Sequence, residues 1–161
     1  MKKTKIDFNK IVVFLPIATA LLTILFMLFS GVKYYKADGS LLDKFSGFNI
    51  IFGLTEVSQF SGVTTSAPIL NFSVVAFLSI LLPLCASLLQ LLSNRLIKLV
   101  ALVLSIGGVV LMFMLPSFIV FSTQALTVFY SYFAYHIGVG AIIGGFILII
   151  QTIVIGYEIL S

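Results

Sequence analysis

The acidic, basic and nucleophilic side chains that could do chemistry are few in this chain and widely spaced. Asp38, Asp43 and Glu56 lie in one segment, and His136, the only histidine, lies far along the chain. General acid–base or nucleophilic catalysis needs such groups to converge at one point, and the sequence contains no phosphate-binding, dinucleotide-binding or zinc-protease motif. Cys85 is the only cysteine, so neither an intramolecular disulfide nor a cysteine-based metal site is expected. We therefore expect a non-enzymatic protein without catalytic residues, metal ligands or a cofactor.

Long apolar segments make up most of the 161 residues. Hydrophobic residues account for 61% of the chain and charged residues for only 9%, which is too few for the polar shell of a soluble domain. A helix needs about 20 residues to cross the hydrocarbon core of a bilayer, and four segments reach that length: 11–32, 69–92, 98–118 and 137–160. The sequence therefore predicts an all-α membrane protein, in which a single domain over 1–161 forms a left-handed bundle of four transmembrane helices.

Basic residues are distributed unevenly between the two sides of this predicted bundle. One side holds most of them: Lys2, Lys3, Lys5, Lys10, Arg95 and Lys98. Cytoplasmic loops of membrane proteins carry an excess of Lys and Arg, so the pattern predicts a multi-pass protein of the cell membrane with both termini in the cytoplasm. This bias accounts for the net charge of +4, and the expected partner is the lipid bilayer and not nucleic acid.

The first outer connection of this topology has 36 residues, over 33–68, and contains most of the polar side chains outside the spans. Ser40 followed by Asp43 resembles a helix N-cap, and the apolar residues after it have helical spacing, which predicts a short amphipathic helix over 41–52. A small hairpin, with strands over 56–60 and 63–65, is the alternative to this helix, or it follows the helix along the chain. The expected recognition surface on this connection consists of Phe45, Phe48, Phe52 and Glu56.

The second outer connection, over 119–136, has no formal charge and is dense in aromatic residues. Aromatic rings gather at both surfaces of a bilayer, where an apolar ring with a polar edge is stable. We interpret these rings as an interfacial belt in preference to a ligand-binding surface.

Small residues recur at helical spacing inside the predicted spans. Helices in lipid associate through close packing of small residues and through interhelical hydrogen bonds. The positions expected to pack helices are Gly140, Ala141, Gly144, Gly145, Ala101, Ser105 and Gly108. A possible polar face is formed by Gln90, Gln151 and Glu158, although a packing seam is the simpler interpretation. Glu158 is expected near the cytoplasmic surface, within reach of Arg95 or Lys98.

The predicted layout resembles that of tetraspan proteins of the claudin type, with both termini inside and a longer first outer loop. The segment Phe52-Gly53-Leu54 is similar to one part of the claudin Trp-Gly-Leu-Trp signature. The chain has no tryptophan and lacks the two loop cysteines of that family, so the resemblance implies the topology and transfers no functional residue.

These observations favour a small, non-enzymatic integral membrane protein that acts by assembly. It would form a homo-oligomer or serve as an accessory subunit of a membrane complex, with the first outer loop as its recognition surface. The alternatives are an oligomeric channel or pore and a protective protein of the bacteriocin-immunity type. The Ile-, Phe- and Lys-rich composition is typical of an AT-rich bacterial genome.

Overall fold

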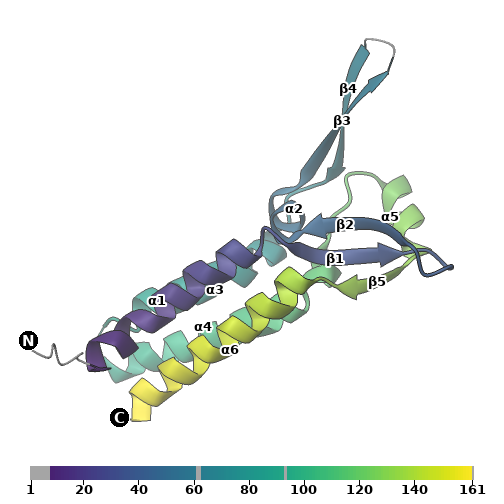
Figure 1. Ribbon diagram of the computed structural model, residues 1–161. Coiled ribbons are helices and arrows are strands. Elements are labelled where there is room, and N and C mark those ends of the chain that lie inside the picture. The colour runs from purple at the N-terminus through teal and green to yellow at the C-terminus, as the bar shows by residue number, and fades with distance from the viewer. Residues whose placement is uncertain (1–7, 61–62, 93, 161) are drawn as a thin grey trace, which may run out of the picture.

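The computed structural model describes residues 8–60, 63–92 and 94–160. Within these residues the chain forms helices that lie side by side and strands that gather at one end of them (Figure 1). In chain order the elements are α1 (Phe8–Phe26), β1 (Ser30–Tyr35), β2 (Leu41–Ser46), α2 (Gly47–Phe52), β3 (Leu54–Phe60), β4 (Val63–Leu70), α3 (Val74–Leu89), α4 (Arg95–Phe113), the 3-10 helix η1 (Leu115–Phe118), α5 (Gln124–Ser131), β5 (Ala134–Ile137) and α6 (Val139–Leu160).

Four helices form the helical body of the protein. Helix α3 packs on α4, α4 on α6, α6 on α1, and α1 on α3. Small side chains lie at these contacts, among them Ala76 and Ser79 on α3 and Ala101 and Ser105 on α4, all of them buried. Helix α1 begins and α6 ends at the same end of the body, and both sheets lie at the opposite end (Figure 1).

A three-stranded antiparallel sheet has the order β2–β1–β5. It covers one end of the helical body because β1 follows α1 after a short turn and β5 leads directly into α6. Side chains alternate between the two faces of a strand. On one face Val32, Tyr34 and Phe45 are buried, whereas Lys33 on β1 and Lys44 on β2 belong to the other face.

The short helix α2 lies between the two sheets and has well-defined ends. The Ser46 side chain accepts a hydrogen bond from the backbone N–H of Asn49, which caps the first turn. Gly53 ends the helix with a φ of 91°, a conformation that glycine adopts without steric strain. The chain then turns into β3, which pairs with β4 in a separate two-stranded antiparallel sheet.

The predicted all-α, four-span, left-handed bundle is wrong, because the fold combines helices with two sheets. Residues at the ends of the predicted spans form other structures: Ser30 belongs to β1 and Leu70 to β4, while Leu115 lies in the 3-10 helix η1. Apolar character does not distinguish a helix from a buried strand, so apolar residues at the strand–helix junctions were counted as helix. The predicted amphipathic helix over 41–52 is also half wrong, because its first part is β2 and only Gly47–Phe52 is helical.

Two of the helices, α4 and α6, are each long and apolar enough to span a membrane. The apolar segments Val13–Phe26 and Val74–Leu89 are helical but shorter. Each of the two helices contains an apolar stretch of 18 residues. Only 22% of that stretch in α4 and 44% of it in α6 is buried in the protein. Both helices therefore leave much of their apolar surface uncovered within the described chain.

Candidate recognition site

The β3–β4 hairpin stands away from the rest of the protein (Figure 1). Its strands are paired along their length, and the hydroxyl oxygens of Ser58 and Thr65 are 2.8 Å apart across them. The side chains described in the outer part of the hairpin are exposed on both faces, and Val57 retains 64% of its accessible surface. Nothing else in the described chain covers this part of the hairpin.

The base of the hairpin is fixed to the body by hydrogen bonds. The backbone N–H of Asn71 donates to the Val120 carbonyl at 2.8 Å, and the Ser122 N–H donates to the Ile69 carbonyl at 3.0 Å. The Ser73 hydroxyl, which also caps α3, donates to the Phe118 carbonyl at 2.7 Å. The hairpin therefore projects from a firm base.

Beyond the bridge between Leu70 and Phe121 at its base, the edges of this hairpin have no strand beside them in the described chain. Natural proteins protect such edges with lysine, proline, bulges or a covering segment, because unpaired N–H and C=O groups attract another strand. In this hairpin the sequence places one charged residue, Glu56, and one proline, Pro68. An isolated two-stranded sheet is only marginally stable in water, so the outer part of the hairpin gains little stability from the rest of the described chain.

An aromatic cluster holds the three-stranded sheet against α5. Tyr130 stacks on Phe121 with ring centroids 4.6 Å apart, and its ring lies 4.8 Å from that of Tyr34. The Tyr130 hydroxyl donates a hydrogen bond of 2.6 Å to Oδ2 of Asp43 on β2. Burial, and then this bond to the Asp43 carboxylate, raise the pKa of Tyr130. Burial, with a contribution from Tyr135, raises the pKa of Tyr34 to about 12.

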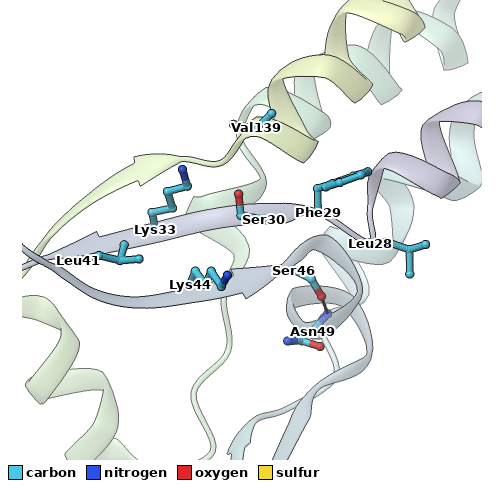
Figure 2. A pocket seen from close by; sticks show the side chains of 9 residues that line it. All are labelled: Leu28, Phe29, Ser30, Lys33, Leu41, Lys44, Ser46, Asn49 and Val139. Atoms are coloured by element: carbon cyan, nitrogen blue, oxygen red, sulfur yellow. Dashed lines mark hydrogen bonds between the residues drawn. The ribbon is translucent and has the colours of Figure 1, made fainter.

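A pocket of about 600 Å³ lies where the three-stranded sheet meets the helical body. Its polar side chains come from β1, β2 and α2, and its apolar ones from the end of α1, the start of β2 and the start of α6 (Figure 2). Ser46 and Asn49 lie together at its edge, joined by the capping hydrogen bond. The Lys33 side chain extends toward the junction near Val139.

The residues predicted as the outer recognition surface are placed in different environments. Phe45 is buried in the aromatic cluster and is not available to a partner. Phe48 and Phe52 on α2 stack with ring centroids 5.8 Å apart, and Phe52 is exposed. Glu56 is exposed on β3. The sequence prediction missed Tyr34, Tyr130 and Asp43 as a connected group, and the available signal was the alternation of Val32 and Tyr34 with the charged Lys33 along β1.

The residues predicted to pack helices are all buried, and they contact neighbouring helices at different distances. A Cβ atom at Gly140 would meet the backbone of α1, 2.5 Å from the Phe26 carbonyl oxygen, whereas one at Gly144 would lie 3.3 Å from a Thr23 methyl. The hydroxyl oxygens of Ser105 and Thr152 are 2.7 Å apart. The complete set is Gly140, Ala141, Gly144, Gly145, Ala101, Ser105 and Gly108.

The residues of the possible polar face bond within the helical body. The Gln151 side-chain amide donates to the Pro83 carbonyl at 2.8 Å, and that of Gln90 donates to the Val13 carbonyl at 3.0 Å. Glu158 forms a 3.4 Å ion pair with Lys98. The two amide nitrogens thus connect helices of one chain, which is how polar side chains stabilise helix contacts away from water.

No protein-family model, curated protein or solved structure matches this chain.

Proposed function

We propose that this chain is a non-enzymatic membrane protein that acts by assembly and that the β3–β4 hairpin is its docking element. The observation that carries the proposal is the hairpin itself, which projects from a fixed base and has both faces and both edges of its outer part uncovered within the described chain. A globular protein gains nothing in core stability from such an element, because it buries almost no apolar surface.

The proposed location is the cell membrane, with α4 and α6 crossing the lipid. The apolar surfaces of α4 and α6 support this location. Arg95 and Lys98 lie at the start of α4, and the ion pair between Lys98 and Glu158 brings the end of α6 to the same level. By the positive-inside rule this end faces the cytoplasm. Both chain termini are then cytoplasmic, and the sheets and the hairpin lie on the outer side.

The proposed partner is an extended segment of another protein that adds as a strand to an edge of the hairpin. Strand addition uses main-chain hydrogen bonds for affinity and alternate side chains for specificity. Thr55, Ser58 and Thr65 are β-branched or small polar residues, which suit a half-covered pleated surface. Glu56 would favour a partner strand with a cationic side chain opposite it.

Site-specific photocrosslinking in native membranes tests this proposal. A photoreactive residue at Val57, in the exposed part of β3, is expected to give one discrete protein adduct. The control position is Ala37, which is also exposed, in the β1–β2 turn, and lies on the same side of the membrane in this proposal. The mass of the adduct distinguishes a second copy of this chain from a different polypeptide.

The same experiment can reject the proposal. Adducts of the same kind and yield from Ala37 and Val57 would mean that the hairpin has no special role. If Val57 gave only lipid adducts or none, docking through the hairpin would be excluded.

A further inference from the structure

We propose that the pocket between the three-stranded sheet and the helical body binds the phosphate-bearing headgroup of an anionic phospholipid. The inference rests on the proposed membrane location, and it assigns a ligand to a site separate from the hairpin. The evidence comes from the pairing of two lysines, from the polar groups beside them and from the exposed apolar residues that line the pocket.

Two lysines stand directly opposite each other in the sheet at this pocket. Lys33 on β1 is the register partner of Lys44 on β2, so both side chains leave the same face of the sheet. His136 on β5 is the register partner of Lys33 on the other side and extends the row. Like charges directly opposite in an antiparallel pair are destabilising. Such a pair is stabilised when an anion lies between the two ammonium groups.

The described residues supply no carboxylate to balance these lysines. The pocket is lined by no acidic side chain, and neither lysine is in an ion pair with a described residue. Asp43, the sequence neighbour of Lys44, points to the other face of the sheet, where it accepts the hydrogen bond from Tyr130. Asp38 accepts hydrogen bonds from Ser40 within the β1–β2 turn. The positive charge of the pocket is therefore open to a ligand.

The remaining polar groups in the pocket include hydrogen-bond donors. The Ser46 oxygen accepts from the Asn49 backbone, which leaves its hydroxyl hydrogen free to donate. The side-chain amide of Asn49 makes no hydrogen bond to a described residue and adds N–H donors. Ammonium, hydroxyl and amide donors around one cavity suit the oxygens of a phosphate. The volume of about 600 Å³ lies in the range of small-molecule sites.

Exposed apolar residues among those that line the pocket favour an amphiphilic ligand over a soluble anion. Leu28 and Phe29, just beyond the end of α1, retain 66% and 58% of their accessible surface, and Val139 at the start of α6 is also exposed. These residues lie at the level where the helical body meets the sheet (Figure 2). A lipid would place its phosphate on the lysines and lay its acyl chains along these residues and the adjacent helices.

Lipid titration followed by native mass spectrometry tests this inference. The full-length protein is placed in nanodiscs of phosphatidylcholine with or without phosphatidylglycerol, and the lipids that remain bound after release are counted. We expect one retained phosphatidylglycerol, with affinity about fivefold lower in Lys33→Gln or Lys44→Gln and about thirtyfold lower in the double variant. Lys36→Gln is the matched control, because Lys36 lies in the connection between the same two strands but outside the pocket.

Three outcomes would overturn the inference. Equal retention of phosphatidylcholine and phosphatidylglycerol would exclude recognition of the charged headgroup. An equal loss in Lys36→Gln would reduce the effect to general surface charge. Complete displacement of the lipid by millimolar inorganic phosphate would assign the pocket to a soluble anion.

Two further readouts keep these results interpretable. The double variant removes a like-charge contact, so its thermal unfolding temperature is expected to be unchanged or higher. If it is, a loss of phosphatidylglycerol binding in this variant is caused by the change in the pocket and not by unfolding. Incorporation into nanodiscs without lipid preference would reject the lipid site alone. A failure to incorporate at all would reject the membrane location on which both proposals rest.

Discussion

The contact between α3 and α4 allows a sharp test of the helix packing, because two adjacent glycines on α4 face very different surroundings. A Cβ atom at Gly108 would lie 2.7 Å from Cδ of Pro83 and still closer to its Cγ. A Cβ atom at Gly107 would meet only Cδ1 of Leu82, at 3.3 Å. Gly108→Ala and Gly107→Ala are therefore the same chemical change at neighbouring helical positions.

The expected energies differ in sign. Both substitutions gain about 1 kcal/mol from the better helix propensity of alanine. At Gly107 the end of the Leu82 side chain can move by a few tenths of an ångström, so most of this gain should remain. At Gly108 the obstacle is a proline ring within α3 that has no other rotamer, and overpacking of this kind costs about 1–3 kcal/mol. The ring carbons lie closer than real Cβ contacts allow, so we expect the upper part of that range and a net loss of about 1–2 kcal/mol.

Thermal unfolding in mild detergent, followed by circular dichroism, measures the difference. Gly107→Ala is expected to unfold at or above the temperature of the unmodified protein, and Gly108→Ala several degrees below it. If Gly108→Ala were as stable as Gly107→Ala, then α3 and α4 would not be in the close contact described here.

Other contacts give predictions with the same measurement. Gly140→Ala should destabilise the protein more than Gly144→Ala, because the first meets the α1 backbone and the second a methyl group; the reverse order would contradict the packing of α1 on α6. Tyr130→Phe should cost about 1–3 kcal/mol by removing the hydrogen bond to a carboxylate, whereas Tyr132→Phe, at an exposed position, should cost almost nothing; equal costs would argue against that bond. Because the pKa of Tyr34 is raised to about 12 in the fold, the free energy of unfolding should be constant just below pH 10. The contribution of Tyr34 to it should fall by about 1.4 kcal/mol per pH unit between pH 10 and pH 12, and a free energy of unfolding that stays flat from pH 9 to pH 12 would refute the burial of this phenol.

The parts of the fold that the sequence predicts well are those with a local cause. The hairpin alternative over 56–60 and 63–65 lies within β3 and β4, because Thr and Val favour strands and the residues between them favour a turn. The apolar length of α4 and α6 follows directly from composition. In each case the signal and the structure occupy the same few residues.

The three-stranded sheet could not be predicted in this way, because its pairing is not local. β5 has only four residues, and it pairs with β1 from the other end of the chain. Without that partner, β1 has the composition of the end of an apolar helix followed by an interfacial anchor. The N-cap of the short helix was predicted at Ser40, because the strand pairing of the residues that follow it, in β2, is not visible in the local sequence. Ser40 bonds to Asp38 in a turn, and Ser46 is the residue that caps the helix.

The pairing of β1 with β5 also sets an order of events during synthesis. β1 and β2 leave the ribosome early and can pair at once, but the strand that completes their sheet follows only after α3, α4 and α5 have been made. One edge of β1 therefore lacks its strand from this chain throughout that interval. Because β5 leads directly into α6, closure of the sheet and placement of the last helix fall in the same late stage of synthesis.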